Sequence, residues 1–425
     1  MIATVHPSYI NGTVRAPRSK SDMQRATAAA LLHNGRTVIK DPGRSNDDLA
    51  ALEVIQKLGA TVLDKGEYIN IESRGVNPSN NEINCGESGL GVRMFTPIAA
   101  LSSNELLVAG SGSLLKRPMN FFDDIFPLLG IKIQSNEGKL PMKIHGPLQP
   151  SNIEVDGSLS SQFLTGLLMA YAASDASGVT ITVNDLKSKP YIDMTLCVIK
   201  SFGMKLPLVK NYREFIFENS HHDYSENDIT YAVEGDWSGA AFLFVAGAIA
   251  NEIRVEGMRE DSVQADKKIL EAIKDAGAKI IYADGVYTIT PSILNAFEFD
   301  ATECPDLFPP LVALAAYCKG ITKIKGANRL THKESNRALT LQDVFGRMGI
   351  EIELKDDWMF VHGGSPLKPA TVHSHHDHRI AMAAAVAALK ATGPIVIEEA
   401  EAINKSYPAF YNDITSLGAT IRIES

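Results

Sequence analysis

The sequence predicts an α/β protein built from six repeats that form two lobes of three. One observation is an amphipathic helix, a glycine and two short strands, seen six times, as in "ALEVIQKLGATVLDKGEYINIE" and "ILEAIKDAGAKIIYADGVYTIT". The other is an alanine-rich apolar helix that leads into a strand, as in "FLTGLLMAYAASDASGVTITV", also seen six times. Both recur in phase about every seventy residues, which favours a repeat over six unrelated helices.

A glycine ends each amphipathic helix, at a position where the backbone commonly adopts a positive φ, which costs little conformational energy only for glycine. These residues are Gly59, Gly130, Gly203, Gly277, Gly349 and Gly418. The alternating residues that follow predict strands. The alanine-rich helices are apolar on nearly every side, so we expect them to be buried and the amphipathic helices to face solvent.

The polar stretch "ENSHHDYSENDIT", residues 218–230, separates the third repeat from the fourth. It is the predicted boundary between the two lobes. A chain of 425 residues is also too long for one hydrophobic core, which favours more than one domain.

Composition narrows the class of protein. The chain is 45% hydrophobic and 21% charged, as in ordinary soluble proteins, and its net charge of −9 argues against nucleic-acid binding. Cys85, Cys197, Cys304 and Cys318 form no CxxC pair and are expected to be thiols in a reducing compartment. No signal-peptide pattern opens the sequence and no apolar run could span a bilayer, so we expect a cytoplasmic protein without membrane contact.

Polar residues precede each apolar helix, in "SKSDMQR", "GESGLGVR", "GSLSSQ", "EGDWSG", "TECPD" and "HHDHR". Ser, Asp and Gly suit helix capping, but Lys, Arg and Gln exceed what a cap needs. A single such residue is more often a plain cap or a solvated charge. If the repeats bring the helix starts together, however, three from each lobe, they predict a cationic cleft for ligands with several phosphates or carboxylates. The cations concerned are Lys20, Arg25, Arg93, Arg117, Lys333, Arg337, Arg379 and Lys405.

The stretch "HSHHDHR", residues 373–379, contains the ligand type that zinc prefers. Its place in the sixth repeat favours a loop and the first turn of a buried helix instead. Asp377 would cap that helix, His378 would orient its neighbours and Arg379 would face a bound anion. His373, His375 and His376 would lie in a solvent-side loop with no shared ligand, and no metal site is predicted.

Longer motifs resemble those of the 3-phosphoshikimate 1-carboxyvinyltransferase family of enolpyruvyl transferases, the 5-enolpyruvylshikimate-3-phosphate (EPSP) synthases. The resemblance covers essentially the whole chain. The motifs are "SKSDMQR", "SLSSQFLTGLLMA", "SKPYIDMTL", "VEGDWSGAAF", "CPDLFPPLVALA", "HKESNR", "DHRIAM" and "NKSYPAF".

The resemblance implies a two-lobed inside-out α/β barrel of six βαβαββ repeats, three per lobe. Residues 1–18 would cross to the C-terminal lobe and join residues 229–425, and residues 19–228 would form the other lobe. The active site would lie in the cleft between the lobes, which would close over the substrates.

The implied activity transfers the enolpyruvyl group of phosphoenolpyruvate to the 5-hydroxyl of shikimate 3-phosphate and releases phosphate. This reaction belongs to the shikimate pathway to chorismate and the aromatic amino acids. The implied partners are these two small molecules, with no nucleic acid, and the protein is expected to be a monomer. No cofactor or metal is expected, because arginines neutralise the substrate charges.

The resemblance also implies roles for individual residues. Asp306 would be the base toward the 5-hydroxyl, with Glu334 and Lys20 as proton donors; Asp306 could equally cap the following helix, or do both. Residues expected to bind shikimate 3-phosphate are Lys20, Ser21, Arg25, Ser160, Ser161, Gln162, Ser188, Tyr191, Asp306 and Lys333. Residues expected to bind phosphoenolpyruvate are Lys20, Gly89, Arg93, Arg117, Gln162, Arg337, Arg379 and Lys405.

Several positions depart from the family pattern. Glu87 and Leu90 replace Asn and Thr of a common Asn-Ala-Gly-Thr motif, and Arg18 replaces a glycine. Residues 327–332, "ANRLTH", and Asn336 also differ. We expect these changes to affect substrate and inhibitor affinity more than the reaction.

Three alternatives remain open. The sister transferase that acts on UDP-N-acetylglucosamine typically has an asparagine after its first-motif lysine and a loop cysteine, whereas Ser21 follows Lys20 here and the Arg117 loop has no cysteine. A non-enzymatic repeat scaffold or clamp predicts a basic face, which the net charge opposes. Glu87 and Leu90, which replace Asn and Thr of the family motif, leave open that the chain is a catalytically inactive relative.

Overall fold

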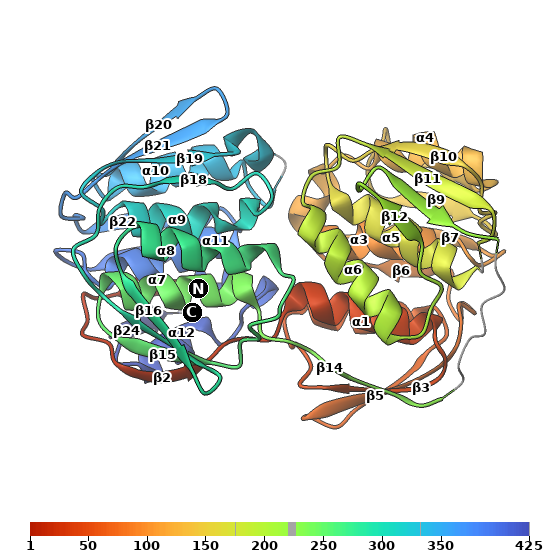
Figure 1. Cartoon of the computed structure of the whole chain (residues 1–425), viewed down its shortest axis with the longest axis horizontal. Coiled ribbons are helices and arrows are strands. Elements are labelled where there is room, and N and C mark those ends of the chain that lie inside the picture. The colour runs from red at the N-terminus through yellow and green to blue at the C-terminus, as the bar shows by residue number, and fades with distance from the viewer. Residues whose placement is uncertain (175, 220–226, 332, 425) are drawn as a thin grey trace. The chain divides into compact units, whose positions relative to one another are not determined.

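The computed structural model describes the chain except residues 175, 220–226, 332 and 425. The chain divides into two compact units: unit 1 comprises Met1–Ser19 and Glu234–Ser425, and unit 2 comprises Lys20–Val233. Both units mix helices and strands (Figure 1). Most of the predicted boundary stretch, residues 220–226, lies outside the described residues.

One repeat of unit 2 shows the predicted order of elements. Strand β10 (Ile153–Asp156) runs parallel to β11 (Val179–Asn184), and β11 pairs antiparallel with β13 (Glu214–Phe217). Strand β12 (Leu208–Lys210) completes the sheet as the antiparallel partner of β13. Helices α5 (Ser161–Ala173) and α6 (Lys189–Ser201) follow β10 and β11, respectively, so the chain order is βαβαββ. The predicted repeat is confirmed here.

The other two sheets described in unit 2 have the same number of strands. Their strand orders are β14-β3-β5-β4, with bounds Ile229–Ala232, Asn34–Lys40, Tyr68–Arg74 and Thr61–Asp64, and β6-β7-β9-β8, with bounds Glu82–Asn84, Glu105–Ala109, Met142–His145 and Lys132–Gln134.

The described part of unit 1 also contains three such sheets. Their orders are β16-β17-β15-β2 (Lys279–Ala283, Val286–Thr290, Ile253–Glu256 and Gly12–Arg15), β18-β19-β21-β20 (Glu298–Asp300, Gly320–Lys325, Trp358–Gly363 and Glu351–Lys355) and β22-β23-β1-β24 (Ala370–His373, Ile395–Glu398, Ile2–Val5 and Ile421–Glu424).

Three of these strands come from distant parts of the chain. Strand β1 pairs antiparallel with both β23 and β24, and β2 pairs parallel with β15, so the N-terminal segment completes two sheets of unit 1. Strand β14 pairs parallel with β3 in unit 2. Residues 229–232 were expected in the other lobe. They lie in unit 2 because β14 pairs with β3 there. Strand β2, which precedes β3 in the sequence, pairs with β15 in unit 1.

The first helix of each repeat is buried, as its apolar composition predicts. Every residue of α7 is buried, and α7, α9 and α11 pack against one another within unit 1 (Figure 1). In unit 2, α3 packs against α1 and α5. These helices are α1 (Lys20–Leu32), α3 (Gly89–Ala99), α5 (Ser161–Ala173), α7 (Trp237–Ile249), α9 (Phe308–Ala315) and α11 (His378–Ala388).

The second helix of each repeat has one buried face, and a predicted glycine follows it. In the second repeat a 3-10 helix, η2 (Phe126–Leu129), lies between the α-helix and Gly130. These helices are α2 (Asn46–Lys57), α4 (Asn120–Ile125), α6 (Lys189–Ser201), α8 (Ile269–Asp275), α10 (Arg337–Arg347) and α12 (Phe410–Ser416). All six glycines have a positive φ, as predicted. At Gly59, with φ of 110°, a Cβ would also lie 2.4 Å from the carbonyl oxygen of Asn77. No helix in the described part of the chain is long and apolar enough to cross a membrane.

Helix α2 begins with a buried capping box. The Oγ of Ser45 accepts a hydrogen bond from the Asp48 amide at 3.3 Å, and the Ser45 amide donates to Oδ2 of Asp48 at 3.0 Å. Burial raises the pKa of Asp48 from 3.8 to about 7, although its bonds with Ser45 act in the opposite direction. The folded chain therefore holds a proton that the unfolded chain releases at lower pH.

We expect the free energy of unfolding to fall as pH rises from about 4 to about 7, because the folded state binds more protons in that window. Asp48→Asn keeps an amide oxygen for Ser45 but cannot ionise, so it should flatten this fall. At pH 8, the free energy of unfolding of Asp48→Asn should exceed that of the parent by an amount that approaches about 1.4 kcal/mol for each unit by which folding shifts the pKa of Asp48. Urea unfolding between pH 4 and pH 8 measures it, with Asp284→Asn at an exposed turn as the control. Equal pH profiles for Asp48→Asn and the parent would contradict this expectation.

Candidate active site

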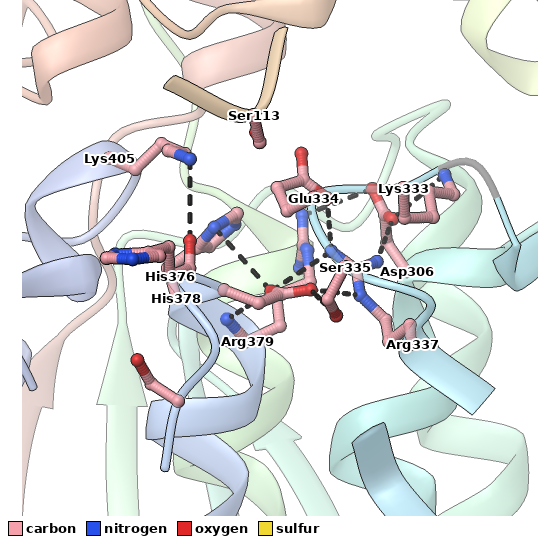
Figure 2. A network of polar contacts seen from close by, with 12 residues as sticks. Ser113, Asp306, Lys333, Glu334, Ser335, Arg337, His376, His378, Arg379 and Lys405 are labelled. Atoms are coloured by element: carbon pink, nitrogen blue, oxygen red, sulfur yellow. Dashed lines mark hydrogen bonds and ion pairs between the residues drawn. The ribbon is translucent and has the colours of Figure 1, made fainter. Parts of the chain in front are cut away.

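Unit 1 brings five of the predicted residues into one cluster of charges (Figure 2). Oδ1 of Asp306 lies 3.2 Å from Nζ of Lys333 and 2.9 Å from Nη1 of Arg337. Oδ2 of Asp306 lies 3.2 Å from Nη2 of Arg379. The fifth residue, Glu334, pairs with Arg337. A carboxylate among three cations is thus the main feature of this cluster.

The cluster is built from the starts of three helices. Asp306 lies in a short 3-10 helix, η4 (Pro305–Leu307), directly before α9. Arg337 is the first residue of α10, and Arg379 is the second residue of α11. The sequence predicted this convergence for α9 and α11, whereas α10 belongs to the second set of helices.

Arg337 makes the largest set of contacts in the cluster. Its side chain is fully buried, with Nε 2.9 Å from Oδ2 and Nη2 3.2 Å from Oδ1 of Asp377. It also contacts Asp306 and Glu334. The resemblance assigned Arg337 to phosphoenolpyruvate, and this structure places its guanidinium among three carboxylates.

Asp377 has two functions, of which the sequence predicted one. It caps α11, because Oδ1 accepts a hydrogen bond from the Arg379 amide at 3.0 Å. It is also the buried counter-ion of Arg337. The sequence predicted the cap, but no pattern in it pointed to the pairing with Arg337.

The charge state of Asp306 follows from its neighbours. Burial alone would raise the pKa of this carboxyl, but Arg379, Lys333 and Arg337 outweigh burial and hold the pKa well below its ordinary value. Burial conversely lowers the pKa of Lys333, and Asp306 counters part of that effect. Asp306 is therefore an ionised carboxylate at neutral pH.

The idea that Asp306 caps the following helix is wrong. Neither η4 nor α9 begins with a side-chain cap, and the N-cap positions are Cys304 and Leu307. Both oxygens of Asp306 face cations instead.

Two further carboxylates near this cluster were not assigned from the sequence. Asp236 caps α7 through the Ser238 amide at 2.9 Å, and the Ser238 hydroxyl donates to Asp266. Burial, with Asp306 as the next largest influence, raises the pKa of Asp266 to about 7. Asp236 falls in the "VEGDWSGAAF" motif, whereas no motif marked Asp266.

Lys405 and the histidine loop complete the cluster. Lys405 ends a 3-10 helix, η6 (Ala400–Lys405), and its Nζ lies 3.5 Å from the carbonyl oxygen of His376. Nε2 of His373 and Nδ1 of His376 lie 3.4 Å and 3.0 Å from Oε2 of Glu399. Both imidazoles thus lie beside the same carboxylate oxygen. Across the described residues, no group of three or more His, Cys, Asp or Glu side chains is arranged to hold a metal ion.

In unit 2, Lys20 and Arg25 project from α1. Nζ of Lys20 lies 2.8 Å from Oδ2 of Asp47, a buried partner that was not predicted. Arg25 is buried and donates to the Thr195 hydroxyl at 2.9 Å and to the carbonyl oxygens of Ser21 at 2.7 Å and Tyr191 at 3.3 Å. Burial lowers the pKa of Arg25 to about 10, which leaves it charged at neutral pH. These contacts tie α1 to α6.

Arg93 and Arg117 lie together at the start of α3. A Cβ on Gly89, the first residue of α3, would lie 2.5 Å from Nη1 of Arg117 and 3.6 Å from Nη1 of Arg93. The Arg93 Nη1 also donates to Oε1 of Gln162 at 2.8 Å. Two guanidinium groups beside a helix N-terminus form a site suited to an anion.

The predicted serines also lie at helix starts. Ser160 caps α5, where its Oγ accepts from the Gln162 amide at 3.2 Å, and Ser161 is the buried first residue of that helix. Ser188 precedes α6 in a left-handed conformation with φ of 57°. Hydroxyls and amides at these ends can donate to phosphate oxygens.

Comparison with known proteins now decides the family. The family model for EPSP synthase (3-phosphoshikimate 1-carboxyvinyltransferase) matches residues 5–414. The chain belongs to the EPSP synthase family. Membership makes it a transferase of the shikimate pathway to chorismate and the aromatic amino acids.

Curated relatives named 3-phosphoshikimate 1-carboxyvinyltransferase include proteins of Clostridium kluyveri, 36% identical over 98% of this chain and 97% of the relative, and Clostridium novyi, 35% identical with the same coverage. EPSP synthase of Acinetobacter baumannii superposes with a TM-score of 0.82 at 25% identity, covering all of both chains. The enolpyruvyl transferase NikO of Streptomyces tendae has a TM-score of 0.77 at 17% identity, covering 99% of this chain and 98% of its own. These neighbours confirm the two-lobed α/β fold class.

The structure shows where the residues that depart from the EPSP synthase pattern lie. Arg18 forms an isolated bridge with Gly235, and Leu90 is buried in α3. Residues 327–330 form a 3-10 helix, η5 (Ala327–Leu330), from which Arg329 donates to the Thr302 carbonyl oxygen at 2.9 Å. Residue 332 lies outside the described residues.

Removal of the Arg337 guanidinium should strongly destabilise the protein. Arg337→Met leaves Asp377 buried without its cation, a change that typically costs about 3–5 kcal/mol. Arg347→Met in the same helix is the matched control, because Arg347 is exposed and pairs with Asp343 at the surface. Urea unfolding measures both variants. A similar small loss in the two would show that the Arg337 network contributes little.

Proposed function

We propose that this chain transfers the enolpyruvyl group of phosphoenolpyruvate to the 5-hydroxyl of shikimate 3-phosphate and releases phosphate. The observation that carries the proposal is the ionised Asp306 held among Lys333, Arg337 and Arg379. It supplies a base and the cations for anionic substrates in one cluster. Family membership and the names of the relatives support the same reaction.

Both clusters would serve the substrates. Guanidinium groups bind carboxylate and phosphate through two parallel hydrogen bonds, which suits Arg93, Arg117, Arg337 and Arg379 for phosphoenolpyruvate. Gly89, Lys405 and Gln162 would add to that site. Residues proposed to hold shikimate 3-phosphate are Lys20, Ser21, Arg25, Ser160, Ser161, Gln162, Ser188, Tyr191, Asp306 and Lys333. Holding two anions in contact can contribute about 7–11 kcal/mol through positioning.

The chemistry needs one base and one acid. Asp306 would take the proton of the 5-hydroxyl as its oxygen bonds to C2 of phosphoenolpyruvate, and Glu334 or Lys20 would protonate C3. In the second step the bond from C2 to the phosphate oxygen breaks, C3 loses a proton and the enolpyruvyl double bond forms again. Each donor has a charged partner in the described structure, Arg337 for Glu334 and Asp47 for Lys20.

Substrate binding would make Asp306 a stronger base. In the described cluster its three cations keep its pKa low. Substrate phosphates and carboxylates compete for the same cations, and each cation they draw away raises the pKa of Asp306 toward the range of an effective general base. The base would thus be strengthened when the reactants are present.

We further propose that the protein acts as a monomer in the cytoplasm. Cys85, Cys197, Cys304 and Cys318 are thiols rather than disulfides in the described structure, which fits a reducing compartment. Light scattering coupled to gel filtration tests the oligomeric state, with a mass near 46.0 kDa expected.

The activity is tested by phosphate release from phosphoenolpyruvate with and without shikimate 3-phosphate. We expect release that depends on shikimate 3-phosphate and none with UDP-N-acetylglucosamine. Release with the sugar nucleotide, or none with either acceptor, would contradict the proposal.

Asp306→Asn should lower kcat by about 10²–10⁴, the range for loss of a general base. Phosphoenolpyruvate should still bind, as measured by calorimetry, because Lys333, Arg337 and Arg379 remain in this variant. Asp300→Asn is the control, since Asp300 is an exposed aspartate of β18 that faces Lys325 at the surface. Full turnover by Asp306→Asn would refute the assignment of the base.

A further inference from the structure

We propose that Glu87 is a positioning residue that holds Arg117 at the start of α3. The inference rests on the proposed function, in which Arg117 binds phosphoenolpyruvate. Glu87 stands where the family commonly has asparagine, so this chain has a carboxylate two residues before Gly89, against which the Arg117 guanidinium lies.

Glu87 connects two segments of unit 2. Its Oε2 accepts hydrogen bonds from the Ser113 amide at 3.3 Å and the Ser113 hydroxyl at 3.4 Å. Close by, the Ser111 amide donates to the Gly86 carbonyl oxygen at 2.7 Å. The segment before α3 thus holds the 3-10 helix η1 (Gly112–Lys116) by backbone and side chain together.

Gly112 allows the carboxylate to lie against the backbone of η1. A Cβ at this position would lie 2.3 Å from Cδ of Glu87, and the residue has a positive φ of 55°. Any other residue would therefore be strained and would displace the carboxylate. Glu87 and Gly112 form a matched pair.

Arg117 directly follows η1, so the position of η1 sets the position of its guanidinium. The Arg117 amide donates to the Leu114 carbonyl oxygen at 3.1 Å, and Leu114 is fully buried. Leu115 and Lys116 are exposed. Leu114, the Ser111 amide and the Glu87 carboxylate thus help to fasten η1 near α3, where Nη1 of Arg117 lies against Gly89.

The negative charge of Glu87 and its hydrogen bonds should have opposite effects on the affinity for phosphoenolpyruvate. A carboxylate near Arg93 and Arg117 reduces the positive field, so loss of its charge alone should tighten anion binding. Loss of its hydrogen bonds should release η1 and weaken binding. Glu87→Gln removes the charge and keeps an oxygen that accepts from Ser113, whereas Glu87→Ala removes both.

Steady-state phosphate release separates the two effects. Glu87→Ala should raise KM for phosphoenolpyruvate about tenfold, the loss expected for one hydrogen bond to a charged group, and leave KM for shikimate 3-phosphate within about twofold. Glu87→Gln should restore KM for phosphoenolpyruvate to the parent value or below it. Gly112→Ala, which displaces the carboxylate without altering it, should behave like Glu87→Ala. Glu105→Ala, at an exposed position of β7, is the control and should change neither KM.

The proposal is overturned if Glu87→Ala leaves KM for phosphoenolpyruvate unchanged or lowers it. It is also overturned if both KM values rise together with a fall in Tm, since a merely structural role predicts that pattern. If Glu87→Ala does not fold, Gly112→Ala with an unchanged KM for phosphoenolpyruvate overturns it equally. If the parent releases no phosphate with shikimate 3-phosphate, the proposed function fails by itself. The Kd of phosphoenolpyruvate from calorimetry then tests Glu87 on the same variants, with the same order expected.

Discussion

The buried guanidinium of Arg337 is the interaction on which the cluster of unit 1 depends. A charge that is fully removed from water is tolerated when several partners satisfy it, and Arg337 has Asp306, Glu334 and Asp377. Those carboxylates come from η4, from the segment before α10 and from the cap of α11. One side chain therefore fixes the starts of three helices relative to one another, and with them Lys333 and Arg379.

The clustered cations of the two units have different partners. In unit 1, carboxylates neutralise the cations, so a substrate anion must replace existing ion pairs. In unit 2, Arg93 has an amide partner in Gln162, and Arg93 and Arg117 share the N-terminus of α3. The carboxylate of Glu87 lies in the segment directly before that helix.

The repeat and its helix ends could be predicted because they depend on local sequence. Gly59 and its five counterparts mark helix ends through a backbone preference, and an apolar surface on every side marks α7 as buried. The long motifs marked Asp306, Lys333, Arg337 and Arg379. The place of β14 could not be predicted, because it depends on which sheet edge is left open when β2 joins unit 1. Asp47, Asp266 and the contact of Glu87 with Ser113 were missed because side-chain pairs between distant segments leave no local pattern.

Cations hold Asp306 ionised in the free protein, and substrate anions would raise its pKa by drawing those cations away. A carbon-13 NMR titration of the aspartate carboxyl groups tests this most directly, with the Asp306 signal assigned by its absence in Asp306→Asn. We expect a pKa well below the ordinary value of 3.8 in the free protein and a higher one with shikimate 3-phosphate and phosphate bound. An ordinary or raised pKa in the free protein, or no rise on binding, would contradict it.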